Sequence, residues 1–481
     1  MIQSNYSAFM APFFRKLSDD QLARIHAASL EILARTGVQL HHPQALDLLR
    51  KAGAAVGEDG WVRIPAHRVE WALRAAPKRI TWANRHGQRV MALEGRNVYY
   101  GPGSDCVNVI DVRTGERRPG TLADIAEAAR VLDALPNINF LMSFCMASDK
   151  PQIIADRYQM QALLTNSTKP ILFVTTDFPG CVDCVEMAEI VAGGADALRH
   201  NPIGACYINV TSPLVHNTES LDKLLFMAGK GLPTTYNPVI LRGANGPITP
   251  AGAVALANAG ELAGLVIAQL VNEGTPIILS GGTQDMLDMR TTGDIYAAPE
   301  NRVLCVEMAH YYNMPIFGLG GCSDSQLPDE QALMEISLTL LAETLAGSHL
   351  IHDVGYLASG MTNSLESVVM ADELINWVKR FMQGIEVSEE TLALDVIQRA
   401  GPANTFMQDD HTRAHYREDW YPKLVERRNF DAWSAAGGQS FRQRAQARAL
   451  KLLATHRPEP LPADMAAAIQ GVVDRAAARY L

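Results

Sequence analysis

Residues 317–329, FGLGGCSDSQLPD, change from apolar and glycine-rich to small and polar within a few positions. The apolar first half is typical of a strand that is buried on both of its faces. The polar second half is typical either of a turn or of side chains that line a site. How often this pattern recurs along the chain decides which fold is expected.

Seven further segments of the same kind occur. In chain order the eight are NVYYG (97–101), NFLMSFC (139–145), PILFVTT (170–176), IGACYINV (203–210), PTTYNPVI (233–240), TPIILSGG (275–282), MPIFGLGG (314–321) and SHLIHDV (348–354). Helical stretches separate most of them, and successive segments begin roughly 30–40 residues apart, as strand–helix units do. We therefore predict a (β/α)8 TIM barrel. An open doubly wound sheet is the alternative, but GLGG at 318–321 lacks the spacing of a dinucleotide-binding loop.

The predicted barrel occupies residues 96–366 of a 481-residue chain. Residues 1–95 are expected to be mainly helical with a small β element, and residues 367–481 to form a helical C-terminal extension. The first helix has a capping box, with Ser18 as N-cap and Gln21 three positions later. RTGERRPGT, residues 113–121, is expected to be a hairpin turn that decorates the first barrel unit.

Charge and composition exclude several classes of function. The net charge is −10, from 42 basic and 52 acidic side chains, and no basic run interrupts that balance, so nucleic-acid and anionic-membrane binding are not expected. The N-terminus has no basic, then apolar, signal pattern, and the longest apolar run is too short to span a bilayer. We expect a soluble, cytoplasmic protein whose seven cysteines are reduced.

The residues that follow the predicted strands should meet at one end of a barrel, where the loops build the site. The set contains aromatic, small polar and acidic groups but no metal-binding motif, nucleophile elbow or phosphate loop, so no protein-held catalytic metal is expected. The candidate ligand-binding residues are Tyr100, Asp105, Tyr207, Asn209, Tyr236, Arg290, Phe317, Asp324, His352 and Tyr356.

Aromatic ring faces attract ammonium centres, and a carboxylate balances their charge, so this set suits a cationic ligand that carries methyl groups. Arg290, or Arg242 in its place, would hold an anionic end of the ligand. Each tyrosine has core packing as an equal alternative, and Asp105 and Asp324 have helix capping as theirs. His411 and His415 lie beyond the barrel and bear on the site only if the tail covers its mouth.

Several segments together resemble the trimethylamine methyltransferase (MttB-like) family. They are IHAASLEILARTGVQL, VYYGPGSDCVNVIDVRTGERRPGTLADI, GGTQDMLDMRTTG, GLGGCSDSQLPDEQA and HTRAHYREDWYP, in an order and spacing that cover nearly the whole chain. The resemblance implies a TIM barrel that transfers a methyl group from a methylated amine to the Co(I) corrinoid of a partner protein. The corrinoid (cobalamin) would be supplied by that partner, with none held tightly by this chain.

The archaeal trimethylamine enzymes of this family carry pyrrolysine in the barrel, and this chain contains no unusual residue. The resemblance is therefore to the branch that acts on quaternary amines, with glycine betaine favoured and proline betaine, carnitine or γ-butyrobetaine as alternatives. A non-catalytic betaine-binding barrel and an unrelated lyase or hydrolase barrel are the other hypotheses. If the chain is a quaternary amine methyltransferase, we expect the glycines of FGLGG to leave room for a substrate or corrinoid. A homo-oligomer is compatible with the size of the barrel.

Overall fold

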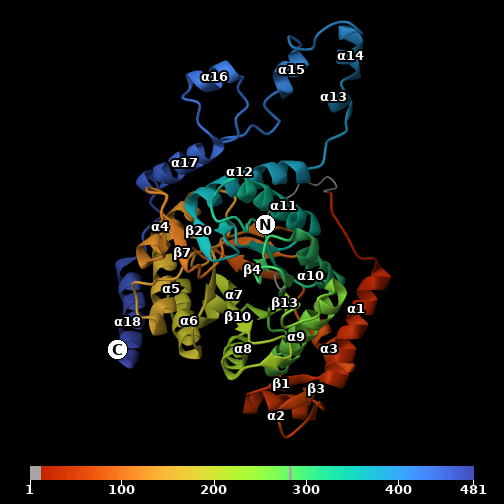
Figure 1. The fold of residues 1–481 in the computed structure, drawn as a ribbon, viewed down its shortest axis with the longest axis vertical. Coiled ribbons are helices and arrows are strands. Elements are labelled where there is room, and N and C mark those ends of the chain that lie inside the picture. The colour runs from red at the N-terminus through yellow and green to blue at the C-terminus, as the bar shows by residue number, and fades with distance from the viewer. Residues whose placement is uncertain (1–11, 281–283) are drawn as a thin grey trace.

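A closed ring of parallel strands forms the centre of the molecule (Figure 1). The computed structural model describes residues 12–280 and 284–481. Seven parallel strands pair in the order β6-β18-β17-β14-β12-β10-β9. Residues 138–145 fill the gap between the two end strands, with single parallel bridges from Ile138 to Tyr100 and from Leu141 to Ile171. The predicted barrel is confirmed, although its second segment is too irregular to form a continuous strand.

The seven regular strands lie within the predicted apolar segments. They are β6 (Tyr99–Tyr100), β9 (Ile171–Val174), β10 (Gly204–Val210), β12 (Thr234–Pro238), β14 (Ile277–Ser280), β17 (Ile316–Leu319) and β18 (Leu350–His352). Gly281 and Gly282, which end the sixth segment, and the neighbouring Thr283 lie outside the described residues.

A helix follows each strand position and covers the ring. In order they are α4 (Leu122–Ala134), α5 (Ala155–Asn166), α6 (Phe178–Ala192), α8 (Thr218–Lys230), α9 (Pro250–Val271), α10 (Pro299–Tyr311), α11 (Glu330–Ala346) and α12 (Leu365–Met382). The short helix α7 (Ala195–His200) follows α6. By length and composition α9 alone among the described helices is apolar enough to cross a membrane, but 83% of its apolar window is buried within the protein.

Side chains alternate along each strand between the barrel interior and the surrounding helices, and the inward-facing ones fill the interior. One buried cluster contains Tyr99, Leu172, Ala205, Ile278, Phe317 and Leu350 from six strands, together with Trp82 and Met91. The last two belong to the hairpin of β4 (Ile80–Ala83) and β5 (Arg89–Leu93). The amide of Ala83 donates to the carbonyl of Pro202, just before β10, so this hairpin closes the N-terminal end of the barrel. A site that opens to solvent is therefore expected at the opposite end, where the barrel strands have their C-terminal residues.

The N-terminal region packs outside the barrel as α1 (Asp19–Glu31), a π-helical turn (Ile32–Thr36), α2 (Pro43–Lys51), α3 (Ala66–Ala75) and the strands β1 (Val38–Leu40), β2 (Ala55–Val56) and β3 (Trp61–Arg63). The predicted capping box is present, because the Ser18 hydroxyl accepts from the Gln21 amide and the Gln21 side chain accepts from the Ser18 amide. Strand β1 pairs with β11 (Val215–His216), which joins this region to the loop after β10.

Two small sheets extend from the C-terminal ends of the barrel strands. The first has the order β19-β20-β7-β8 and contains the predicted hairpin, β7 (Asn108–Ile110) with β8 (Arg117–Pro119), beside β19 (Tyr356–Leu357) and β20 (Thr362–Ser364). The second joins β13 (Ile240–Arg242), β15 (Gln284–Leu287) and β16 (Asp294–Ile295). Loops that follow strands one, five, six and eight thus build the rim of the mouth.

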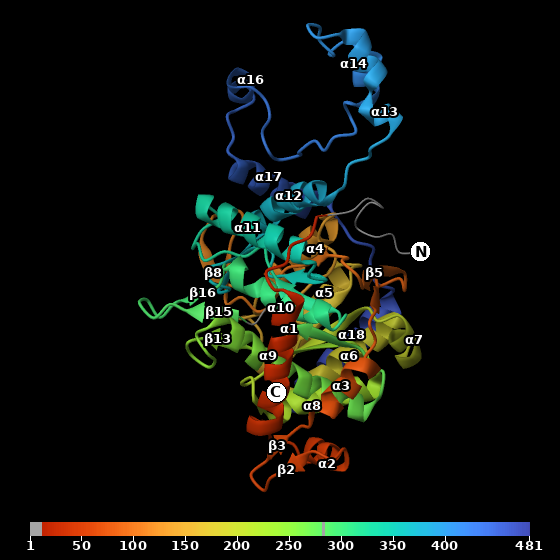
Figure 2. The ribbon, with the colours of Figure 1, turned by 90° about the vertical axis from the view of Figure 1, so that its right-hand side faces the viewer.

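The C-terminal extension has two parts. Helices α17 (Phe441–Thr455) and α18 (Ala463–Tyr480) return along the barrel, where α17 packs on α4 and α12 and α18 packs on α5 and α6. Most of residues 384–436, which we call the outer lobe, stands away from the barrel beyond α12 (Figures 1 and 2), while the amides of Lys423 and Leu424 donate to the Glu373 carboxylate on α12. The outer lobe contains α13 (Glu389–Leu392), α14 (Leu394–Ala400), α15 (Asp410–His415) and α16 (Phe430–Ala435).

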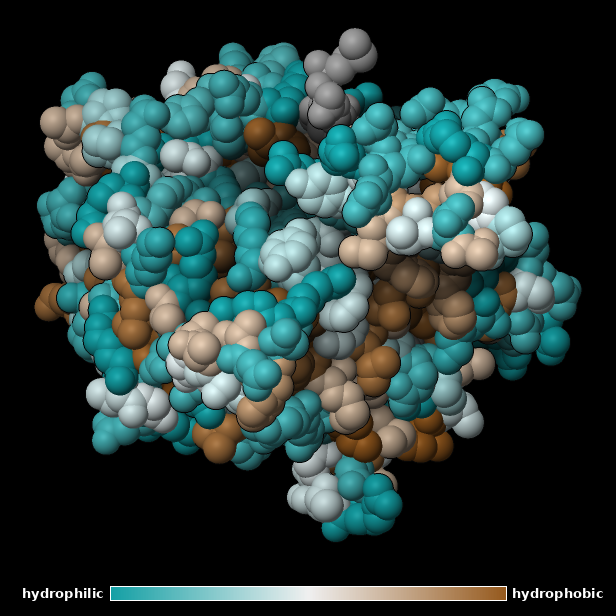
Figure 3. Space-filling view, turned by 90° about the horizontal axis from the view of Figure 1, so that it is seen from above, coloured by the Kyte–Doolittle hydropathy of each residue, from teal (hydrophilic) through white to brown (hydrophobic). Residues whose placement is uncertain are grey.

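No residue of these four helices is buried. Large apolar side chains of the outer lobe are instead exposed, among them Ile385, Met407, Tyr421 and Phe430. Seen from above in Figure 3, apolar residues lie among hydrophilic ones over this end of the molecule. The outer lobe therefore lacks an apolar core of its own.

Candidate functional site

Three aromatic rings from three strands of the ring meet inside the barrel. They belong to Tyr207 on β10, Phe317 on β17 and His352 on β18, and we call them the aromatic trio. The rings of Phe317 and His352 are stacked with their centroids 3.9 Å apart. Tyr207 is edge-on to Phe317 at 5.4 Å and tilted to His352 at 6.5 Å. Three of the predicted site residues are thereby brought together.

A buried carboxyl group lies against this trio. Oδ2 of Asp353 lies 3.2 Å from Nε2 of His352 and accepts a hydrogen bond from the hydroxyl of Tyr296. Asp353 is 1% exposed and has a left-handed backbone with φ of 71°, a conformation that is uncommon for a non-glycine residue. Burial raises the pKa of Asp353 and lowers the pKa of His352, and each group partly opposes the shift of the other.

Two tyrosines form a second aromatic layer beside Asp353. The rings of Tyr296 and Tyr356 are stacked with centroids 6.3 Å apart, and the Tyr356 hydroxyl donates to the carbonyl of Ser104. The guanidinium of Arg302 lies 4.6 Å from the centre of the Tyr296 ring. Arg302 also forms a buried ion pair with Asp285, so its charge is balanced locally. The predicted residue Tyr356 is therefore part of the same assembly.

Asp105 lies in the loop that follows β6, with φ of 58°. Its Oδ1 accepts hydrogen bonds from the Ser143 hydroxyl at 3.0 Å and from the Gln159 amide at 3.3 Å. Both donors are uncharged, and burial raises the pKa of Asp105. The capping alternative does not apply, because Thr121 caps α4, the helix that follows.

The barrel interior opens toward solvent along β9 and β10. Val174 and Tyr207 are half-buried and Asn209, two residues further along the strand, is exposed. These positions point inward, since Val174 and Tyr207 pack against the cluster inside the barrel and Asn209 lies on the same face of β10 as Tyr207. A small ligand that approached from this side would meet the Tyr207 ring of the aromatic trio first.

Asp324 is a positioning residue for Tyr296 rather than a helix cap. Its carboxylate accepts hydrogen bonds from the amides of Tyr296 at 3.1 Å and Ala297 at 3.2 Å, and from the Ser359 hydroxyl at 2.8 Å. The cap of α11 is Asp329, whose side chain accepts from the amide of Ala332. Within residues 317–329, Asp324 therefore positions Tyr296 and Asp329 caps α11.

The glycines of FGLGG do not leave room for a ligand, and that expectation was wrong. A Cβ on Gly318 would lie 2.0 Å from the Ser348 hydroxyl oxygen and 2.4 Å from the Glu343 carboxylate, both outside the ring. On Gly320 the nearest atom would be the Thr339 carbonyl oxygen at 3.1 Å. The space beside these glycines is occupied by α11 and by the loop that precedes β18.

Tyr100 and Tyr236 face the surrounding helices instead of the barrel interior. The Tyr100 hydroxyl lies 2.9 Å from that of Thr344 on α11. The Tyr236 hydroxyl lies 2.6 Å from Nδ1 of His216, and its ring occupies the space beside Gly264 on α9. Strand alternation sends only every second residue inward, and these two tyrosines follow the core-packing alternative instead of the predicted ligand contact.

Arg290 also lies apart from the aromatic trio. It sits in the turn between β15 and β16, which projects from the body of the protein in Figure 2. Its side chain is 85% exposed and pairs with Asp288 at 2.9 Å. The alternative, Arg242, is buried and donates to the carbonyl of Ile248 at 3.2 Å.

Four residues of the assembly, Tyr296, Asp353, Asp285 and Arg302, were not among the predicted binding residues. Asp353 follows His352 directly, so the end of strand eight carried a signal for it. Tyr296, Asp285 and Arg302 come from the loop after β14 and from α10. Asp285 lies within GGTQDMLDMRTTG, one of the segments that carry the family resemblance, but no local signal marks any of the three as part of a site. Only the closure of the ring brings this loop over the mouth.

Comparisons with known proteins identify the family of the chain. The family model described as "Trimethylamine methyltransferase (MTTB)" matches residues 3–480. Trimethylamine methyltransferase MttB of Desulfitobacterium hafniense is 32% identical over 96% of this chain and 94% of its own length. Glycine betaine methyltransferase of another strain of that species is 30% identical over 96% and 97%.

Among solved structures, monomethylamine methyltransferase MtmB of Methanosarcina barkeri is similar with a TM-score of 0.49 and 11% identity, over 92% of this chain and 88% of that one. The family model covers nearly all of the sequence, and two curated relatives are at least 30% identical along almost their full lengths. The chain therefore belongs to the trimethylamine methyltransferase family.

Proposed function

We propose that this protein transfers a methyl group from a quaternary amine, with glycine betaine the favoured substrate, to the Co(I) corrinoid of a partner protein. The observation that carries the proposal is the aromatic trio with Asp353 directly behind it. Ring faces and a carboxyl group are the groups that bind a methylated ammonium. The family assignment supports the reaction class, and relatives named for trimethylamine and for glycine betaine support the substrate class.

The chemistry requires little of the protein beyond binding and orientation. The corrinoid would supply Co(I), a strong nucleophile, whose electron pair takes the methyl carbon. The C–N electron pair stays on nitrogen, and a quaternary amine then leaves as a neutral tertiary amine without a proton. Tyr207, Phe317 and His352 would desolvate the cation and hold one methyl group toward the mouth. The partner would therefore dock around the rim of the barrel.

Quaternary amines are preferred over trimethylamine because this chain contains only standard amino acids. A tertiary amine is a poorer methyl donor and needs activation, a role that fits the pyrrolysine of the archaeal enzymes. The buried carboxyl groups of Asp105 and Asp353 accept from uncharged donors or from His352, so the site favours a permanent cation. Proline betaine, carnitine and γ-butyrobetaine share this cationic head.

The test is a methyl-transfer assay with purified protein, the reduced corrinoid partner and single quaternary amines. We expect the corrinoid absorbance to change with glycine betaine and dimethylglycine to appear by mass spectrometry. Trimethylamine serves as the matched comparison and should give little product. If no quaternary amine gives product but calorimetry shows that betaine binds, the protein is a non-catalytic binding barrel. If neither occurs, the proposed substrate class is wrong.

A cytoplasmic location and a homo-oligomer stay predictions.

A further inference from the structure

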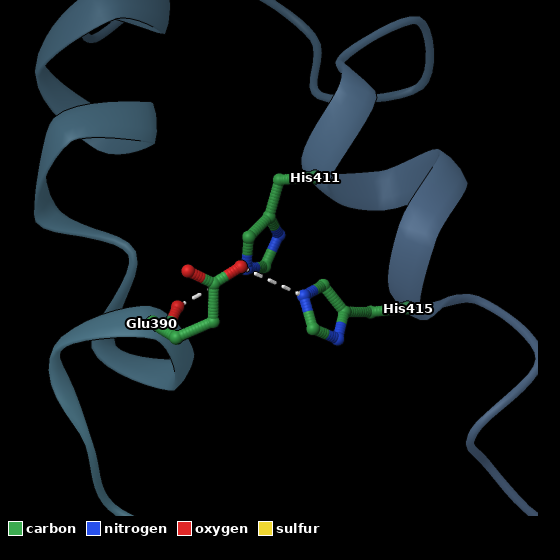
Figure 4. A group of neighbouring side chains, drawn as sticks. All are labelled: Glu390, His411 and His415. Atoms are coloured by element: carbon green, nitrogen blue, oxygen red, sulfur yellow. Dashed lines mark hydrogen bonds and ion pairs between the residues drawn. The ribbon is translucent and has the colours of Figure 1, made fainter.

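Three potential metal ligands meet in the outer lobe, away from the barrel (Figure 4). They are Glu390 on α13 and His411 and His415 on α15. One ligand atom of each lies within 4.8 Å of the others. The two histidines are four positions apart, which places both rings on one face of α15. Their ring centroids are 4.4 Å apart.

The spacing of these atoms suits an ion. Nε2 of His415 lies 3.2 Å from Oε1 of Glu390, and Nε2 of His411 lies 3.2 Å from the backbone carbonyl oxygen of the same residue. A tetrahedral zinc ion with bonds of about 2.0–2.1 Å holds neighbouring ligand atoms roughly 3.3–3.4 Å apart. Small side-chain rotations would therefore bring the carboxylate and both imidazoles around one ion.

A fourth residue orients one of the histidines. Nδ1 of His415 lies 2.9 Å from the carboxylate oxygen Oε1 of Glu418. Metal-binding histidines usually donate their second ring N–H to a carboxylate, which fixes the tautomer and leaves the other nitrogen free to bind. In this arrangement Nε2 of His415, the atom that faces Glu390, is the one left for the metal.

The helices of the outer lobe have no apolar core to hold them together, which a metal ion would do. None of the residues in α13, α14, α15 or α16 is buried. Segments without an apolar core are commonly held together by a disulfide or a metal. All seven cysteines of the chain lie outside residues 384–436, so a disulfide within the outer lobe is excluded.

We propose that Glu390, His411 and His415 bind one divalent transition metal, with zinc favoured, and that this ion fastens α15 to α13. Imidazole nitrogens with one carboxylate are a ligand set that zinc accepts, with water in the fourth position. A groove lined by Glu390, His411 and Ala414 borders two of the three ligands and provides space for that water. The site is separate from the proposed methyl-transfer chemistry, and its ion would act through structure.

The experiment uses the full chain without a polyhistidine tag, stripped of metal by a chelator. Zn²⁺ is titrated against a chromophoric competitor, and Co²⁺ is used as a spectroscopic probe. We expect one tight equivalent per chain, with affinity reduced at least about 100-fold in the double variant His411→Gln/His415→Gln. Glu418→Gln should weaken binding about 10-fold, as loss of an orienting carboxylate does elsewhere. His67→Gln, an exposed histidine on α3, is the matched control and should bind like the wild type.

Hydrogen exchange over residues 384–436 provides the second measurement. Zn²⁺ should slow exchange in the outer lobe of the wild type and of His67→Gln but not of the double variant, with the barrel unchanged in all three. Equal zinc affinity in the wild type and the double variant would overturn the site, and the cluster would then be an ordinary group of ion pairs. Tight binding without slower exchange would overturn the fastening role.

Discussion

The ring of His352 is held between two oxygen atoms, one on each ring nitrogen. Nδ1 lies 2.6 Å from the carbonyl oxygen of Gly318, and Nε2 lies 3.2 Å from Oδ2 of Asp353. A carbonyl oxygen only accepts, so Nδ1 carries a proton. The contact between Nε2 and Oδ2 then needs one further proton, which belongs either to His352 or to Asp353. The pair is electrically neutral in both cases.

This shared proton predicts how substrate binding depends on pH. A quaternary ammonium beside the aromatic trio favours the ionised carboxylate, so binding should release the proton from the pair. Burial raises the pKa of Asp353, which places the release above the usual range of an aspartate. We expect betaine affinity to increase with pH through that pKa and then to level off. Calorimetry in buffers of different ionisation enthalpy measures the proton released per ligand bound.

Asp353→Asn should remove both the pH dependence and much of the affinity. At an effective dielectric constant of about 20, an opposite charge at ~5 Å contributes a few kcal/mol, so a loss of at least tenfold is expected. Asp329→Asn is the matched control, because Asn caps a helix about as well as Asp and the contacts of Asp329 are with the cap of α11 and the Ser325 hydroxyl, not with the aromatic trio. An unchanged pH profile in Asp353→Asn would show that another group releases the proton.

Phe317→Leu tests whether the aromatic trio recognises charge. Leucine keeps an apolar side chain but removes the ring face, so affinity for glycine betaine should decrease by about 0.5–2 kcal/mol. In 3,3-dimethylbutyrate a carbon atom replaces the ammonium nitrogen, so this analogue keeps the shape and the carboxylate of glycine betaine without the positive charge. Its affinity should decrease much less. Calorimetric titration of both ligands gives the comparison. Equal losses would mean that Phe317 contributes shape alone.

The control for that variant is Tyr236→Phe. Its hydroxyl contacts His216 behind the strand, and burial lowers the pKa of that histidine to about 3, so the pair is neutral. Loss of this hydrogen bond should reduce the free energy of unfolding by about 1 kcal/mol and leave both ligand affinities unchanged.

Asp324→Asn should disturb the site although asparagine is nearly the same size as aspartate. The native carboxylate accepts at Oδ1 from Tyr296 and Ser359 and at Oδ2 from Ala297. An amide presents NH2 at one of these positions, where it would face a backbone N–H. We expect a loss of about 1–3 kcal/mol in unfolding free energy and slower methyl transfer. If this variant matches Asp329→Asn in both measurements, Asp324 does not position Tyr296.

The barrel was predictable because most strands are apolar or β-branched along their length and the strand–helix period is regular. That regularity also located Tyr207, Phe317 and His352 on barrel strands. It did not show which residues face inward. Tyr99 and Tyr100 are adjacent and both fully buried, yet Tyr99 lies in the cluster inside the barrel and Tyr100 packs against α11. Only strand pairing fixes that choice.

The contacts that the loops make at the site could not be predicted from the sequence, for a different reason. Tyr296 meets Asp353 across 57 positions of sequence, and Asp324 holds Tyr296 across 28. Contacts of this kind depend on how the ring closes and leave no local pattern. The outer lobe was predicted as helix but not as a separate projection, since its apolar residues resemble those of packed helices.

Gly103→Ala should displace the side chains of Tyr356 and Asp353. A Cβ at this position would lie 2.1 Å from Cζ of Tyr356 and 2.2 Å from Oδ1 of Asp353, so both side chains would have to move. We expect destabilisation of about 1–3 kcal/mol, as for overpacking elsewhere, and loss of betaine binding beyond that of Asp353→Asn alone. Chemical denaturation and calorimetry measure the two effects.

Gly229→Ala on α8 is the matched control for Gly103→Ala, because no atom lies within 4 Å of its added Cβ. The control variant should be slightly more stable than the wild type, since alanine favours helix over glycine by roughly 0.5–1 kcal/mol. Normal binding by Gly103→Ala would mean that Tyr356 and Asp353 can shift without affecting the ligand. The assembly around Asp353 would then not be the binding site.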